Sequence, residues 1–152
     1  MIKDIRTGSS SSSPQNLTDI NGTLFFSAQD GTNGSELWKS DGTSAGTTMV
    51  RDISTGSSSS SPSYLTDVNG TLFFSANNAT NGSELWKSNG TEAGTTLVKD
   101  IYPGSLNSSP SYLTDVNGTL FFQTYDATNG CVVLSSSGTE AKTTLVKDIY
   151  PG

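Results

Sequence analysis

The sequence predicts an all-β protein made of three tandem copies of one unit, and three observations support this. A segment that begins NGTLFFSAQDGTNGSELWKS at Asn21 returns from Asn69 and, with more changes, from Asn117, at a fixed period of 48 residues. Short apolar runs alternate with Asn-Gly and other turn signals. Only 32% of the 152 residues are hydrophobic and 14% are charged, a content that suits short strands and many turns. A period of this length indicates units that bury their apolar faces against one another.

The second repeat shows the strand signals best. Residues 64–68 (YLTDV) and 71–76 (TLFFSA) flank Asn69-Gly70 and predict a hairpin with a type I′ turn, because both central residues of that turn need positive φ. Residues 84–88 (ELWKS) and 96–101 (TLVKDI) predict a third and a fourth strand. Each unit is therefore expected to form a four-stranded antiparallel meander.

The second strand of each unit carries large apolar groups on both of its faces. In the second repeat, Leu72, Phe74 and Ala76 alternate with Phe73, so that neither face of the strand is wholly polar. This pattern predicts a small sheet that packs between two neighbouring sheets.

Gly- and Ser-rich links that end in proline join the units at residues 8–14, 56–62 and 104–110. A chain that passes from the outer strand of one sheet to the inner strand of the next must cross about three strand spacings, roughly 14 Å. About seven small residues can do so, and we favour this interpretation over a disordered linker or a site of O-glycosylation.

We therefore expect one repeat domain over residues 1–152. It contains repeat 1 (residues 14–53), repeat 2 (residues 62–101), an atypical terminal repeat 3 (residues 110–149) and a surplus outer strand at residues 2–5.

The stretches ELWKSDGTSAGT from Glu36 and ELWKSNGTEAGT from Glu84 resemble the ELWxxDGTxxGT repeat of large secreted bacterial proteins. The order of the strands is also similar to that of kelch-type β-propeller blades. The resemblance covers nearly the whole chain and implies propeller-like blades, an extracellular or cell-surface location and a structural or adhesive role. It carries no catalytic residues. The third copy departs from the pattern, since Val132, Val133 and Leu134 replace Glu-Leu-Trp.

Three blades cannot close a ring, because propellers need about four to eight. The outer strand occurs four times, at residues 2–5, 50–53, 98–101 and 146–149, against three copies of the others. The surplus strand could close a seam or be donated to another chain, which makes Ile2, Ile5, Val146 and Ile149 the candidate assembly residues. A homodimer would give six blades and a non-closing contact a fibre. A β-trefoil is the alternative fold, and it needs no partner.

Composition excludes several classes of function. The net charge of −6, from 8 basic and 14 acidic residues, opposes binding to nucleic acid. No apolar run is long enough to insert into a membrane, and no signal-peptide core follows Met1. The chain has no histidine, so histidine-based catalysis is excluded. Asp19, Asp67 and Asp115 recur at one position and are better explained as turn caps than as paired catalytic carboxylates. We expect no enzymatic activity.

Calcium is the one metal hypothesis, and no other cofactor is expected. Oxygen-bearing side chains recur at a spacing that could wrap a hard cation, although the same residues also mark ordinary turns. The candidate ligands are Asp30, Asn33 and Glu36 in the first repeat, Asn78, Asn81 and Glu84 in the second, and Asp126 and Asn129 in the third.

Carbohydrate is the alternative partner, with Trp38 and Trp86 as candidate stacking residues of a repeat lectin. The competing interpretation places both indoles between adjacent blades, and Leu134 in the third repeat favours it, because leucine fills a core. Asn-x-Ser/Thr sequons recur but mostly coincide with Asn-Gly turns. We therefore expect an extracellular module that assembles with copies of itself or with neighbouring repeats.

Overall fold

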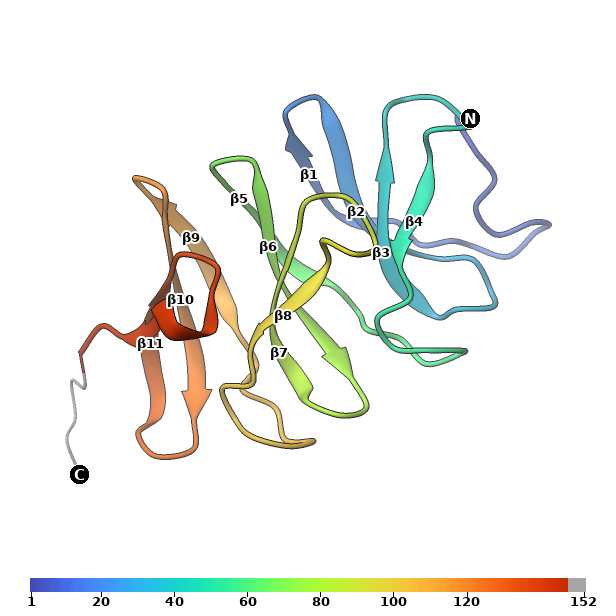
Figure 1. The fold of residues 1–152 in the computed structure, drawn as a ribbon. Coiled ribbons are helices and arrows are strands. Elements are labelled where there is room, and N and C mark those ends of the chain that lie inside the picture. The colour runs from blue at the N-terminus through green and yellow to red at the C-terminus, as the bar shows by residue number, and fades with distance from the viewer. Residues whose placement is uncertain (148–152) are drawn as a thin grey trace.

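The computed structural model describes residues 1–147 and contains three four-stranded antiparallel sheets, one for each repeat, which follow one another in chain order (Figure 1). The first sheet comprises β1 (Gln15–Ile20), β2 (Thr23–Gln29), β3 (Ser35–Ser40) and β4 (Thr48–Arg51). The second comprises β5 (Ser63–Val68), β6 (Thr71–Asn78), β7 (Gly82–Ser88) and β8 (Thr96–Lys99). The third comprises β9 (Ser111–Val116), β10 (Thr119–Asp126), β11 (Gly130–Ser136) and β12 (Thr143–Leu145), with a 3₁₀ turn at Glu140–Lys142.

The all-β class and the four-stranded meander are confirmed, and the Asn-Gly turns explain why the first two strands of each unit pair. Asn69 and Gly70 have φ angles of 53° and 79°, and the equivalent residues of the other repeats have nearly the same values. A type I′ turn needs both angles positive, and its twist matches that of the flanking strands. The turn therefore fixes the register in which Val68 lies opposite Thr71.

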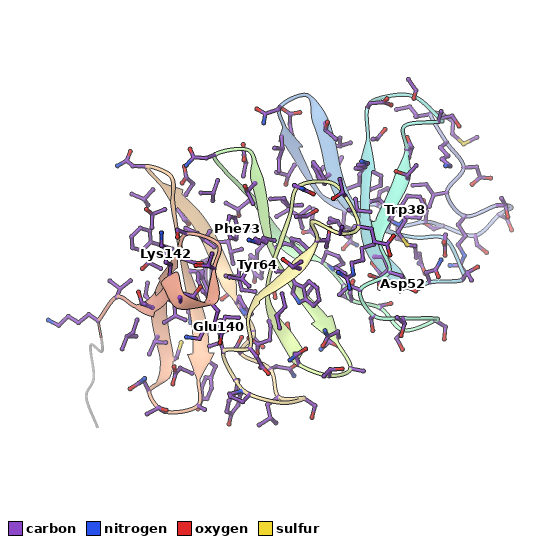
Figure 2. The ribbon with its side chains drawn as sticks, viewed as in Figure 1. Trp38, Asp52, Tyr64, Phe73, Glu140 and Lys142 are labelled. Atoms are coloured by element: carbon purple, nitrogen blue, oxygen red, sulfur yellow. The ribbon has the colours of Figure 1, made fainter. Side chains whose placement is uncertain are left out.

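Both faces of the second sheet are covered, as the alternating pattern predicts. Phe74 and Ala76 pack in one core cluster with residues of the first sheet, whereas Phe73 packs in another with residues of the third. Figure 2 labels Phe73, which lies between the second and third sheets. We call these two contacts the first joint and the second joint.

Each repeat closes its strands into a sheet of its own, and no strand of one repeat pairs with a strand of another within residues 1–147. The trefoil alternative, in which the repeats share one barrel, is therefore wrong. Among these residues, no helix is long and apolar enough to cross a membrane.

The prediction of a strand at residues 2–5 is also wrong. These residues form no strand in the structure, because a strand needs a pairing edge and none of the three described sheets pairs with them. Ile5 nevertheless packs against the first sheet, beside Phe26 and Trp38.

Candidate functional site

Four apolar positions on one sheet fill each joint from the N-terminal side. In the first joint they are Ile20, Phe25, Leu37 and Val50, and in the second joint they are Val68, Phe73, Leu85 and Val98. The following sheet packs against these four residues with the face that is turned toward the preceding sheet. In the second sheet, the side chains on that face include Leu72, Phe74 and Trp86. The two joints therefore use the same contact twice.

The third sheet presents the same four positions to solvent. Val116 is 48% exposed where Val68 is 5% exposed, and Val133 is 38% exposed where Leu85 is fully buried. Phe121 is half-buried, and Val146 is exposed. We call this surface the back face. It is the donating half of a joint without a receiving sheet.

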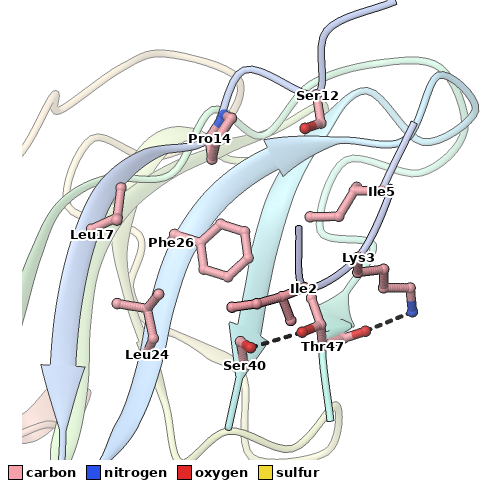
Figure 3. A pocket seen from close by; sticks show the side chains of 10 residues that line it. All are labelled: Ile2, Lys3, Ile5, Ser12, Pro14, Leu17, Leu24, Phe26, Ser40 and Thr47. Carbon is pink, nitrogen blue, oxygen red and sulfur yellow. Dashed lines mark hydrogen bonds between the residues drawn. The ribbon is translucent and has the colours of Figure 1, made fainter. Parts of the chain in front are cut away.

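The first sheet is open on its opposite side, which we call the front face. Leu17 is 63% exposed there, and Pro14 is exposed although the equivalent Pro62 and Pro110 are buried. A cavity of about 250 Å³ lies between the sheet and residues 2–5, and Leu24 and Phe26 contribute to its wall (Figure 3). The front face is the receiving half of a joint without a donating sheet.

The turn glycines after the third strands show the same difference. The phenyl ring of Phe25 lies against Gly90, and that of Phe73 lies against Gly138, with 3.1 and 3.0 Å from the ring to the position of a Cβ. The equivalent Gly42 has nothing within 4 Å of that position. The phenylalanine of the third sheet that is equivalent to Phe25 and Phe73 is Phe121, and it lies on the back face without a glycine against it in residues 1–147.

Lysines also bridge the joints. Lys39 Nζ donates to the carbonyl of Gly90 across the first joint, and Lys87 Nζ donates to that of Gly138 across the second, both at 2.7 Å. Ser135 stands at the equivalent position of the third sheet. The back face keeps the apolar residues of a joint and lacks the lysine at this position.

Buried glutamates hold the links between the sheets. Glu36 is fully buried, and its carboxylate accepts the amides of Ile53 and Ser60, both at 2.9 Å, and the Ser60 hydroxyl at 2.6 Å. Glu84 binds Ile101 and Ser108 in the same way. Sequence reasoning missed this role, although the glutamate and the serine 24 residues later both recur in the first two repeats.

Burial raises the pKa of Glu36 and of Glu84, and the hydrogen bonds from the link oppose that rise. Val132 stands at this position in the third repeat, so the third sheet lacks this carboxylate.

The predicted calcium ligands divide into two groups. Asp30 accepts the amides of Thr32 and Asn33 within its own loop, and those hydrogen bonds lower its pKa although burial opposes them. The residues Asn78, Asn81, Asp126 and Asn129 make similar bonds in the equivalent loops. Glu36 and Glu84 are fully buried and already bound to the links, which argues against them as calcium ligands. Calcium binding by the loop residues stays a prediction, and no group of three or more acidic, His or Cys side chains in residues 1–147 is placed to hold a metal.

The two tryptophans lie inside the protein. Trp38 is 6% exposed and Trp86 4% exposed, each in an apolar cluster on the receiving side of its sheet. A sugar needs an open ring face, so neither indole can stack on one in this conformation.

The remaining candidate residues have local roles. Asp67 and Asp115 accept the amides of Gly70 and Gly118, which caps the hairpin turns as expected. Cys131 is an exposed free thiol. Among the assembly residues, Ile2 is exposed at the front face and Val146 at the back face, while Ile149 lies outside the described residues.

Comparison of the chain with protein-family models, with curated proteins and with solved structures found no match.

Proposed function

We propose that the chain is a structural module whose propeller-like blades join end to end, with copies of itself or with neighbouring repeats, outside the cell. One observation carries the proposal: the back face and the front face are the two halves of the contact that the chain already makes at both of its joints. The extracellular location and the adhesive role rest on the resemblance to ELWxxDGT repeats. Catalysis has no part in the proposal.

The contact between two copies is heterologous, because the back face of one copy meets the front face of the next. Val116, Phe121 and Val133 of one copy would cover Gly42 and enter the cavity beside Leu24 of the other. Such a contact leaves one open face at each end, so it extends into a chain of copies unless its rotation closes a ring.

The association should be reversible. Fully burying a valine or phenylalanine side chain gives about 1.5–3 kcal/mol, whereas bringing two proteins together costs about 4–15 kcal/mol. This contact between two copies, which we call the seam, also lacks the equivalents of Lys39 and Glu36, which reinforce the internal joints. We therefore expect oligomers that grow with protein concentration.

Sedimentation velocity over a range of concentrations tests the proposal. The wild-type chain should shift toward larger species as concentration rises, and Val133→Glu should remain monomeric, because it places a charge at the centre of the back face. Thr128→Glu is the matched control, since it adds the same charge to an exposed loop of the same sheet and should associate like the wild type. A monomer at every concentration, or equal effects of the two variants, would exclude stacking through these faces.

The lectin alternative loses the stacking platform that motivated it, since both tryptophans are buried.

A further inference from the structure

Residues 1–14 make the contacts of an internal link, although no sheet precedes them in the structure. Lys3 Nζ donates to the Thr47 carbonyl at 2.7 Å, in the way that Arg51 donates to Thr95 and Lys99 to Thr143 (Figure 3). Gln29 N donates to Ser12 O, as Asn77 N and Tyr125 N do to the equivalent serines Ser60 and Ser108.

Ile5 completes the correspondence. It packs beside Phe26 and Trp38, as Ile53 packs in the cluster that contains Phe74 and Trp86. The N-terminal segment therefore occupies the place on the front face that belongs to the outer strand and link of a preceding sheet.

The back face brings a second segment to that same place. Residues 146–149 read Val-Lys-Asp-Ile, which is identical to residues 98–101 and nearly identical to the Ile-Lys-Asp-Ile of residues 2–5. When a back face docks on a front face in the geometry of the internal joints, Val146 and Lys147 of one copy meet Ile2 and Lys3 of the other at one position. Two segments cannot fill it together.

The anchoring contacts decide between them. Three interactions repeated from the internal joints hold the N-terminal segment, through Lys3, Ile5 and Ser12. Beyond β12, the described chain is held by the hydrogen bond from Val146 N to Val133 O, and Val132 replaces the glutamate that would anchor the C-terminal segment.

Resting on the stacking proposed above, we infer that residues 2–5 of one copy complete the outer strand of the third sheet of the copy docked on its front face, and that Val146 and Lys147 of that sheet give way. The seam strand is then composite, with Thr143–Leu145 from one chain and residues 2–5 from the other. Ile2 takes the position that Val50 and Val98 fill in the internal joints. Both Ile2 and Val146 are exposed in the single chain, and only one of them is needed at the seam.

Removal of residues 146–152 tests the inference, because it leaves β12 in place and removes only the competing segment. The dissociation constant from sedimentation velocity should fall about tenfold, since nothing has to be displaced. Ile2→Asp in the truncated chain should reverse the gain. Circular dichroism and thermal melting establish that each variant keeps the fold.

Val146→Asp in the full-length chain provides a second test if the truncated chain fails to fold. It should not weaken association when the tail is displaced, and it should weaken association when the tail is seated. A truncation or a Val146→Asp change that weakens association would overturn the inference, as would a truncation without effect. If the wild-type chain still associates and Val133→Glu still blocks that association, the stacking proposal stands although this inference fails. If the chain is monomeric in every variant, both the stacking proposal and this inference fail.

Discussion

Glu84 and Glu36 show how one buried side chain can organise a link that has little apolar content. Each carboxylate replaces the water that the amides of Ile101 and Ser108, or of Ile53 and Ser60, would otherwise bind. Buried amides without an acceptor are costly, so the glutamate allows a serine-rich segment to pass through the interior.

Glu84→Ala should lower the free energy of unfolding by about 2–4 kcal/mol, because it leaves the buried amides of Ile101 and Ser108 without an acceptor. Urea denaturation measures the loss. Glu92→Ala removes an exposed glutamate of the same repeat and should change stability little. Equal stability of the two variants would show that the carboxylate does not hold the link.

The raised pKa of Glu36 and Glu84 gives stability a defined dependence on pH. A carboxyl whose pKa is higher in the folded state binds more protons there, so its contribution is complete below the unfolded value, about 4.3, and is lost as the pH rises through the folded value. The Tm should therefore fall as the pH rises above about 4.3, and the double variant Glu36→Gln, Glu84→Gln should flatten that slope whatever its absolute Tm. Parallel profiles for the two proteins would contradict this assignment.

At the scale of the element, the links depend on glycines that allow a close backbone approach. Gly82 begins β7 with φ of +68°, and a Cβ there would overlap the carbonyl oxygen of Leu106 in the passing link. Gly34 meets the Ser58 carbonyl in the same way. Gly130 has a similar φ of +71°, and no atom of residues 1–147 lies within 4 Å of the position of its Cβ.

Gly82→Ala should therefore cost more stability than Gly130→Ala. Both substitutions carry the strain of a left-handed backbone, about 1–2 kcal/mol, but only the first also pushes a methyl group into backbone, which adds roughly 1–3 kcal/mol. Chemical denaturation of the two variants isolates the close approach. Identical losses would mean that the link can move aside at no cost.

The elements that sequence could predict are those fixed by local chemistry. Strands, Asn-Gly turns and the two-sided pattern of β6 follow from residues close together in the chain, and the structure agrees. The glutamate contacts join residues 24 apart, and nothing local distinguishes Glu36 from a loop ligand. Residues 2–5 carry a strand sequence but have no edge to pair with, so the period alone predicted them wrongly.

At the scale of the whole molecule, the chain is a series of like sheets with unlike ends. Internal joints combine apolar packing with a lysine that donates to a turn glycine and with a buried glutamate, whereas the back face keeps the apolar residues Val116, Phe121 and Val133 and lacks both of those polar groups. Because Val132 and Ser135 replace the two polar groups, the seam should be weaker than the joints.

The most direct measurement is therefore a gain of association in Ser135→Lys, followed by sedimentation velocity. If the back face docks on the front face in the geometry of the internal joints, the introduced lysine should donate to the Gly42 carbonyl of the next copy, as Lys39 does to Gly90. The dissociation constant should then fall by about tenfold or more, because a hydrogen bond from a charged group contributes about 1.5–3 kcal/mol. Thr128→Lys, which changes the net charge equally at an exposed loop, should leave the constant unchanged. An equal response to both lysines, or to neither, would contradict the claim that the open faces are two halves of one joint.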